Sequence, residues 1–198
     1  GSAFKPFVYG AALEAGFTPA TLLDDAKKSY PNPDGKRWEP RNYGGVYYGT
    51  TTLRLALAHS LNSATLDLAE RVGPPAITDF ARRLGVKSPL ENSLAVALGA
   101  SEVSLLELTA AYAPFVNGGF RVEPVLITAV EDARGGLLEY GEWEREPVIK
   151  PALAYLVTSL LESVVTDGTA SGLGKVYAWD RPAAGKTGTT TGGRDAWF

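Results

Sequence analysis

Apolar residues recur at helical spacing close to the start of the chain. They are Phe7, Val8, Ala11, Ala12 and Leu13. This spacing predicts a helix that ends near Gly16. Pro6 is tolerated only in the first turn of a helix, because deeper in a helix it removes a hydrogen bond and clashes with the preceding turn. The helix is therefore expected to begin at about Ser2.

The same helical period returns in the middle and later parts of the chain. Helices are expected from about Thr51, over 63–72 before the stop Gly73-Pro74-Pro75, over 77–85, from Ser104 to 118, and over 151–167. Ser104 and Glu107 have the spacing of a capping box, in which each residue's side chain bonds the other's backbone amide.

Strand patterns are confined mainly to the later half. Residues 124–140 predict two strands around an Arg134-Gly135-Gly136 turn, and residues 183–198 predict two more, joined by a Gly192-Gly193 turn. Residues 30–49 are rich in proline, glycine and aromatic residues without a period, which indicates an ordered loop. Several helices with a small late sheet predict an α+β, or mixed α/β, class.

Composition sets broad limits on function. The 198 residues are 45% hydrophobic and 21% charged, which is typical of a globular chain with a hydrophobic core. A net charge of -3 argues against non-specific nucleic-acid binding. The absence of cysteine excludes disulfides and thiolate metal sites. Because methionine is also absent, we expect the sequence to be part of a longer one, with any signal peptide or membrane anchor outside it.

Ser2 and Lys5 form the first candidate for chemistry. Three residues apart on a helix, they share one face, so a neutral lysine could accept the proton of the serine. Burial by Phe4 and Phe7, and a second cation nearby, would lower the pKa of the lysine. About one Ser-x-x-Lys is expected by chance in such a chain, and Gly1-Ser2 alone resembles a cloning remnant.

The motif "KTGT" at residues 186–189 is a rarer signal, expected by chance in well under about 1% of such chains. It does not complete a phosphate-binding loop, because an aspartate stands where that loop needs its first glycine. At the rim of a sheet, Lys186 would supply a fixed cation and Gly188 a close approach for a ligand. The Thr189 amide could donate to an oxyanion, and the hydroxyls of Thr187 and Thr189 could hold a carboxylate.

Ser60 and Asn62 form the third candidate, although polar residues between helices are usually caps. Two residues apart, they converge on one site only if the flanking helices break there. His59 is the only histidine, and we favour a capping or partly buried role over a catalytic triad. Asp195, beside a glycine turn, is interpreted as structural. The aromatic residues of the 30–49 loop either line a cleft near Asn62 or, as we favour, pack within the loop; they are Trp38, Tyr43, Tyr47 and Tyr48.

Together the three elements resemble the S-x-x-K, S-x-N and K-T-G set of penicillin-binding proteins and serine β-lactamases. More closely, the chain resembles the transpeptidase domain of class A, bifunctional penicillin-binding proteins over nearly its whole length. The stretches that carry this likeness are "GSAFKPFVYGAAL", "YYGTTTLRLALAHSLN", "ALGASEVSLLELTAAYAPFVNGG" and "AAGKTGTTTGGRDAWF". The resemblance implies that residues 1–198 form one transpeptidase domain, truncated at both ends, with helices packed on a small, mainly antiparallel sheet.

The resemblance also implies acyl transfer by a serine nucleophile. Ser2 would attack the D-Ala–D-Ala bond of a peptidoglycan stem peptide, and Lys5 would take the serine proton. Ser60 would relay a proton to the leaving amine, and Asn62 would hold the substrate amide. An amine of a neighbouring strand would then accept the acyl group and cross-link the cell wall.

Substrate-binding roles follow from the same resemblance. The backbone N–H groups of Ser2 and Thr189 would form the oxyanion hole. Lys186, Thr187 and Thr189 would bind the terminal carboxylate, beside Gly188. No cofactor is implied.

The implied partners are stem peptides, β-lactam antibiotics as covalent inhibitors, and a glycosyltransferase domain of the same full-length chain. The resemblance places the protein at the extracytoplasmic face of a bacterial membrane, held only by an anchor outside this sequence. Two alternatives stay open. A serine β-lactamase would need a deacylating glutamate, for which Glu91 in "ENSLA" is an imperfect match. A non-catalytic penicillin-sensing module would keep the same serine and lysine.

Overall fold

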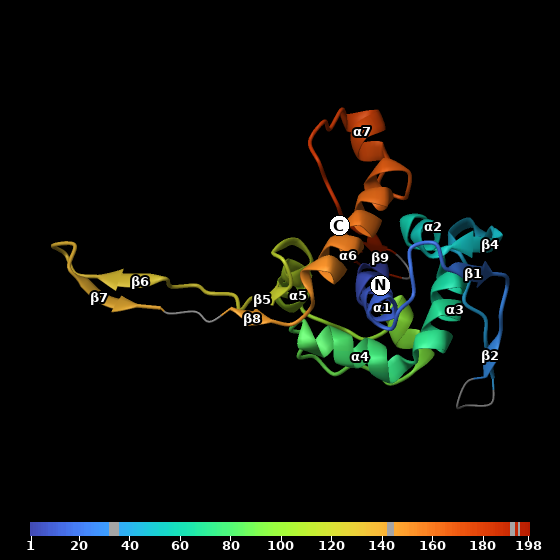
Figure 1. Cartoon of the computed structure of the whole chain (residues 1–198), viewed down its shortest axis with the longest axis horizontal. Coiled ribbons are helices and arrows are strands. Elements are labelled where there is room, and N and C mark those ends of the chain that lie inside the picture. The colour runs from blue at the N-terminus through green and yellow to red at the C-terminus, as the bar shows by residue number, and fades with distance from the viewer. Residues whose placement is uncertain (32–35, 142–144, 191–192, 194) are drawn as a thin grey trace.

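Helix α1 (Lys5–Glu14) lies at the centre of the molecule (Figure 1). The structure is a computed structural model and describes residues 1–31, 36–141, 145–190, 193 and 195–198. Helix α1 follows a single 3-10 turn, η1 (Ser2–Phe4), so the helical start predicted at Ser2 is confirmed. Every residue from Lys5 to Leu13 is buried, because α3, α4 and α6 pack around the helix. Among these buried residues Lys5 is the one charged side chain.

Five further helices match the predicted stretches. They are α2 (Leu53–Ala58), α3 (Asn62–Val72), α4 (Pro74–Arg83), α5 (Leu105–Val116) and α6 (Pro151–Thr166). The short helix α7 (Gly172–Tyr177) and the 3-10 turns η2 (Tyr43–Gly45) and η3 (Leu94–Leu98) were not predicted. The Ser104 cap is confirmed, since its hydroxyl accepts the Glu107 N–H.

Two helix boundaries differ from the prediction. Helix α2 begins at Leu53 rather than at about Thr51, because Thr52 is its N-cap and accepts the Leu55 N–H. Pro74, expected to belong to a stop, instead begins α4, where a missing N–H costs nothing.

The strands form antiparallel pairs. The pairs are β1 (Leu22–Asp25) with β4 (Gly49–Thr52), β2 (Tyr30–Pro31) with β3 (Arg37–Trp38), β5 (Phe120–Arg121) with β8 (Glu146–Pro147), β6 (Ala129–Glu131) with β7 (Leu137–Tyr140), and β9 (Gly188–Thr189) with β10 (Ala196–Trp197). The α+β class is confirmed, and within the described residues these pairs stay separate rather than joining into one sheet.

The two strand pairs that the sequence predicted are confirmed, whereas the β1–β4, β2–β3 and β5–β8 pairs were not predicted. The hairpin around Arg134-Gly135-Gly136 and the terminal pair are both confirmed, although Gly192 lies outside the described residues. The β1–β4 pair was not predicted, because β1 buries the charged Asp25 and so lacks the usual apolar pattern.

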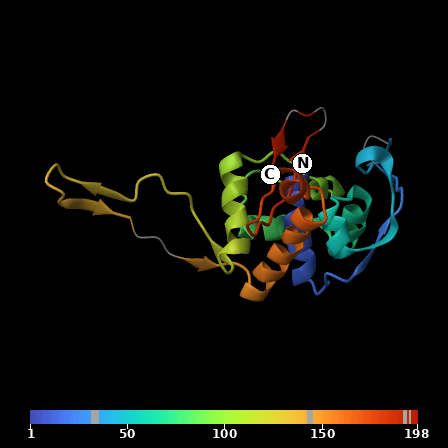
Figure 2. The same cartoon turned by 90° about the horizontal axis from the view of Figure 1, so that it is seen from above.

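The β6–β7 hairpin projects from the helical body in both Figure 1 and Figure 2. Its residues are all exposed, whereas the core surrounds α1. In the described part of the chain, no helix has the length and apolar character needed to cross a membrane.

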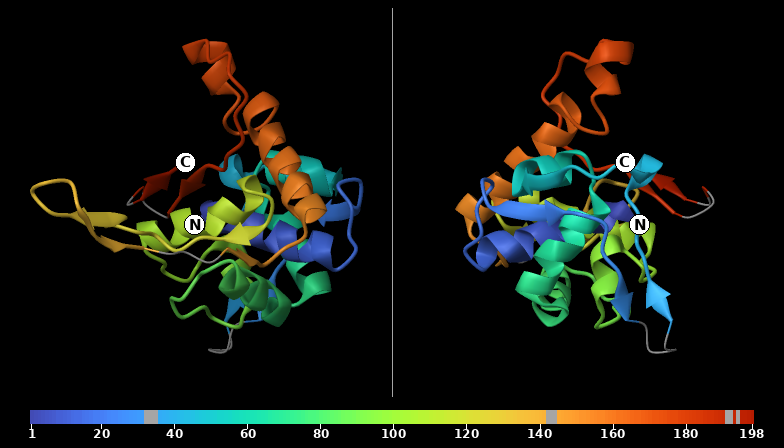
Figure 3. Two further views of the ribbon diagram at one scale, coloured as in Figure 1. Left: turned by 60° about the vertical axis from the view of Figure 1, so that its left-hand side comes forward. Right: turned by 90° about the vertical axis from the view of Figure 1, so that its right-hand side faces the viewer.

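The N-terminal turn and the C-terminal strands lie beside each other, as Figure 3 shows from two sides. Strand β9 packs against η1 at Gly188, where an added Cβ would come within 2.9 Å of both Cβ and N of Ala3. Only glycine permits this approach. The fold thereby brings the first and last predicted motifs together.

Candidate active site

Lys5 is fully buried, and its ammonium group donates three hydrogen bonds. Nζ lies 2.7 Å from the Ser60 carbonyl oxygen, 3.2 Å from Ser60 Oγ and 2.7 Å from Asn62 Oδ1. These acceptors use all three donors of the group. Burial lowers the pKa of Lys5 well below its ordinary value, the charge of Lys186 lowers it further, and Asp25 opposes the shift. The second cation anticipated from the sequence is therefore present.

Ser60 and Asn62 both contact Lys5 because the helical conformation is interrupted between α2 and α3. Their spacing of two residues required such an interruption for both to reach one site. Ser60 has φ +55, a left-handed conformation that residues other than glycine rarely adopt. Asn62 is the first residue of α3. The turn directs the carbonyl and hydroxyl of Ser60 and the side chain of Asn62 toward the same ammonium group.

Ser2 lies one helical turn before Lys5 and is half-buried. Its carbonyl accepts the Lys5 backbone N–H, which fixes the turn. The turn is also anchored by the chain's amino group, which donates to the Gly99 carbonyl at 2.6 Å, and by the Tyr112 hydroxyl, which donates to the Ala3 carbonyl. Within the described residues the Ser2 hydroxyl has no hydrogen-bond partner, so it is available to a ligand.

Lys186 is the second buried lysine, with 1% of its surface exposed. Nζ donates to the carbonyl of Thr187 at 3.0 Å and to its hydroxyl at 3.4 Å. The Thr187 hydroxyl in turn lies 2.8 Å from that of Thr169. Burial lowers the pKa of Lys186 to about 8. Because β9 begins only at Gly188, the strand alternation that would separate Lys186 from Thr187 does not apply.

Thr189 is exposed at the outer side of β9, whereas Gly188 is buried against η1. An added Cβ on Gly1 would lie 3.1 Å from the Thr189 carbonyl, so the two backbones nearly touch. The structure therefore places the backbones of residues 1–3 and 188–189 side by side.

Sequence reasoning missed Asp25 and Asn42, which are both buried beside this site. Asn42 donates to the Asp25 carboxylate and accepts from the backbone of Asn62. No local pattern marks them, because one lies in an unpredicted strand and the other in a loop without a period.

His59 and Asp195 occupy structural positions. His59 is the C-cap of α2, as favoured, but it is exposed and stacks on Tyr48 at 6.3 Å between ring centres. The Asp195 N–H donates to the Thr190 hydroxyl at 2.9 Å, which confirms its structural role in the turn.

The aromatic residues of the 30–49 loop differ in their burial. Trp38 packs against Tyr30, as predicted for loop packing, with ring centres 5.7 Å apart. Tyr43 and Tyr48 are instead exposed. The loop does reach the site, since Asn62 Nδ2 donates to a loop carbonyl at 2.6 Å.

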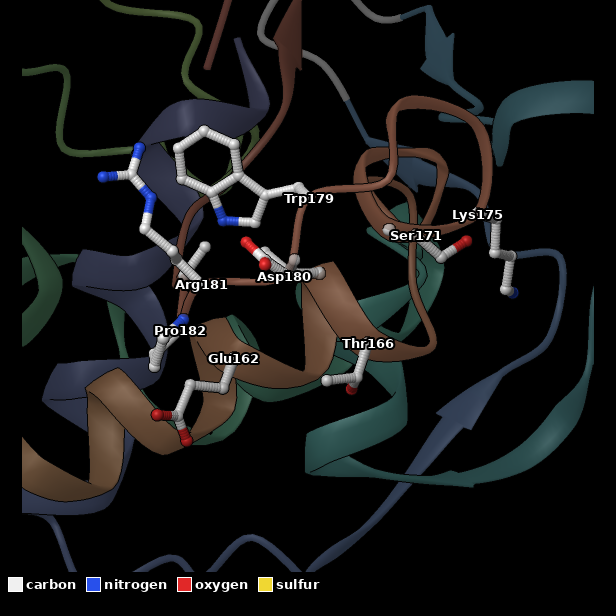
Figure 4. A pocket seen from close by; sticks show the side chains of 11 residues that line it. Glu162, Thr166, Ser171, Lys175, Trp179, Asp180, Arg181 and Pro182 are labelled. Atoms are coloured by element: carbon white, nitrogen blue, oxygen red, sulfur yellow. The ribbon is translucent and has the colours of Figure 1, made fainter.

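A separate pocket of about 550 Å³ lies between the end of α6, α7 and the segment that follows (Figure 4). The Arg181 guanidinium lies 4.5 Å from the centre of the Trp179 ring there. Glu162, Lys175 and other residues complete the lining, and none of the eight candidate residues belongs to it. The candidate site is therefore distinct from this pocket.

Residues 1–196 match the family described as the penicillin binding protein transpeptidase domain. The chain belongs to this family. Among curated relatives, the penicillin-binding protein 1A of Aquifex aeolicus is 39% identical over 199 residues and that of Neisseria lactamica 40% over 207. Each comparison covers all of this chain, but the chain spans only 27% and 26% of those relatives.

Solved structures of penicillin-binding proteins share the fold. Penicillin-binding protein 1A from Haemophilus influenzae superposes with a TM-score of 0.92 at 31% identity, over 100% of this chain and 35% of that one. PonA1 from Mycobacterium tuberculosis in complex with penicillin V gives 0.79 at 25% identity, over 98% and 54%. The penicillin-binding transpeptidase fold expected from the motifs is confirmed.

Proposed function

We propose that this chain is the core of a peptidoglycan D,D-transpeptidase domain, with Ser2 as its nucleophile. The observation that carries the proposal is the environment of Lys5, a buried lysine of lowered pKa one turn from an available serine hydroxyl. A lysine can act as a base only when neutral, and burial beside a second cation favours the neutral form.

The proton path follows from the bonds of Lys5. Once neutral, its amine keeps two N–H donors for the Ser60 carbonyl and Asn62 Oδ1 and has one lone pair for the Ser2 proton. Ser2 Oγ bonds to the carbonyl carbon of the D-Ala–D-Ala peptide as its proton passes to Lys5. Ser60 Oγ, 3.2 Å from Lys5 Nζ, then relays a proton to the departing nitrogen. D-Alanine leaves. An incoming amine later bonds to the acyl carbon, and Ser2 Oγ departs from it as the surplus proton of the amine returns through Ser60 and Lys5 to Ser2.

Substrate binding is assigned to the opposite side of the site. The backbone N–H groups of Ser2 and Thr189 would stabilise the oxyanion, which is where such donors contribute most to acyl transfer. Lys186 would hold the terminal carboxylate with the hydroxyls of Thr187 and Thr189. Gly188 keeps this segment close to the serine turn.

The wider assignments rest on the family. The full-length protein would add a glycosyltransferase domain and a membrane anchor, and residues 1–198 would be one part of its transpeptidase domain. It would act outside the cytoplasmic membrane on stem peptides, without a cofactor and without a nucleic-acid partner. β-Lactams, which mimic the dipeptide, would acylate Ser2.

Mass spectrometry after incubation with benzylpenicillin tests the proposal. One adduct per chain is expected on the peptide that contains Ser2, and Ser2→Ala should abolish it. Ser171→Ala, in the separate pocket, is a matched control and should label normally. An adduct on another residue would contradict the assignment.

Two further assays separate the alternatives. Steady hydrolysis of nitrocefin without a lasting acyl-enzyme would indicate a β-lactamase. A stable adduct together with failure to pass a stem-peptide acyl group to an acceptor amine would indicate a penicillin sensor.

A further inference from the structure

Asp25 is a buried carboxylate at the end of β1, with none of its surface exposed. Its oxygens accept Asn42 Nδ2 at 2.9 Å, the Tyr48 N–H at 3.0 Å and the Ala64 N–H at 3.2 Å. Burying a charge costs free energy unless hydrogen bonds compensate it. Among the described residues, every hydrogen-bond donor to Asp25 is a neutral group. Ala64 lies in the first turn of α3, whose dipole also favours the negative charge.

Asn42 connects this carboxylate to the start of α3. Its Nδ2 group donates to Asp25 and to the Val46 carbonyl, while its Oδ1 accepts the N–H groups of Asn62 at 2.7 Å and Ser63 at 3.2 Å. Only one orientation of the amide satisfies these partners, since the donors must face the carboxylate. The side chain is therefore fixed between β1 and α3.

Asn62 is consequently held at both its backbone and its side chain. The Asn42 side chain accepts from its N–H, and the neighbouring Arg41 carbonyl accepts from its Nδ2 at 2.6 Å. The remaining side-chain atom, Oδ1, is thereby directed to Lys5 Nζ, 2.7 Å away. Displacement of this oxygen would move the lysine, whose distance from Ser2 governs proton transfer.

We infer that Asp25 and Asn42 are positioning residues that act through Asn62 to hold Lys5 in reach of the Ser2 hydroxyl. This inference rests on the proposed function. A 1 Å displacement of a catalytic group lowers rates by up to about 100-fold, so the effect should be large on chemistry and small on β-lactam binding.

Saturation kinetics of acylation by a fluorescent penicillin test the inference, because they separate the acylation rate constant from the dissociation constant. Asn42→Ala should lower the rate constant about 10- to 100-fold and change the dissociation constant less than about threefold. Asp67→Asn is the matched control. Asp67 also joins β1 to α3, through the Asp24 N–H and ion pairs with Lys28 and Arg71, but it does not reach Lys5.

A pH profile distinguishes a change in the position of Lys5 from a change in its pKa. Lys5 faces three charges, those of Lys186, Asp25 and the chain's amino group. Asp25→Asn keeps the shape of the side chain but removes the charge that raises the pKa of Lys5, so the pH of half-maximal acylation should fall. Asn42→Ala keeps that charge and should lower the rate at every pH.

The outcomes are separable. If the parent chain is not acylated at Ser2, the proposed function fails. If it is acylated and folded Asn42→Ala reacts at the parental rate, the positioning inference is wrong. Should Asn42→Ala prove unfolded by circular dichroism, the isosteric Asp25→Asn decides, and a parental maximal rate in that variant would overturn the inference even if its pH midpoint falls.

Discussion

Burial and, after it, the positive charge of Lys186 lower the pKa of Lys5, although the two lysines come from opposite ends of the chain. Both side chains are almost completely withdrawn from solvent. Two cations buried near each other make the neutral form of one of them more accessible, which is what a lysine base requires.

Removal of the second cation should therefore move the pH dependence of acylation. Lys186→Gln removes a positive charge that lowers the pKa of Lys5, so the pH at half-maximal acylation should rise, whatever the change in the maximal rate. Lys186→Arg keeps the charge and should keep the midpoint. The profile is measured with a fluorescent penicillin from pH 5 to 10 in steps of about half a unit. Equal midpoints for Gln and Arg would show that the charge of Lys186 has no such role.

Folding stability should increase from about pH 8 to about pH 10. The pKa of Lys186 is about 8 in the folded chain and about 10.4 when unfolded, so in this window the unfolded state binds more protons. Stability then rises with pH, by roughly 1 to 3 kcal/mol, and Lys5 acts in the same direction. Above pH 10 the trend should reverse, because burial raises the pKa of Tyr30 to about 12 and unfolded tyrosines ionise first.

Urea denaturation at several pH values measures this effect. Lys186→Gln should flatten the rise between pH 8 and 10, since it removes the group responsible. An unchanged slope in that variant would assign the rise to other groups.

Gly188→Ala should disable acylation while leaving most of the fold intact. The added methyl group would lie 2.9 Å from Cβ and N of Ala3, so β9 and the serine turn must move apart. We expect a fall of about 100-fold in the acylation rate. Gly174→Ala is the control, because a Cβ there meets nothing closer than 3.8 Å. Normal acylation by Gly188→Ala would mean that the contact is not required.

Ser60→Ala and Ser60→Gly should differ in stability but share a chemical defect. Both remove the hydroxyl proposed to relay a proton, so both should slow release of D-alanine from a stem-peptide substrate. At φ +55 glycine is unstrained and alanine is not, so Ser60→Gly should be the more stable by about 0.5 to 1 kcal/mol. Denaturation curves and D-alanine release provide the two measurements, and fast release by either variant would exclude the relay role.

Local features of the sequence were sufficient to predict every described helix except α7, and to find the separate motifs. The position of Pro6 placed the start of the first helix, and the Ser104 hydroxyl caps α5 as its spacing indicated. The order of the three motifs identified the family, which the match over residues 1–196 confirms. Such features depend on neighbours within a few residues, so they can be recognised in a single chain.

The sequence alone therefore determined the helical pattern, the family and the candidate residues. The tertiary structure decided what surrounds them. The bond between Lys5 and Asn62 spans 57 positions, and the burial of Asp25 depends on the pairing of β1 with β4 and on the loop that carries Asn42. A buried aspartate in a strand contradicts the usual alternation of apolar and polar residues, so no periodicity could reveal it. The free-energy cost of burying the charge of Asp25 is offset by hydrogen bonds from groups distant in the sequence, among them the N–H groups of Tyr48 and Ala64. These bonds form only in the folded chain.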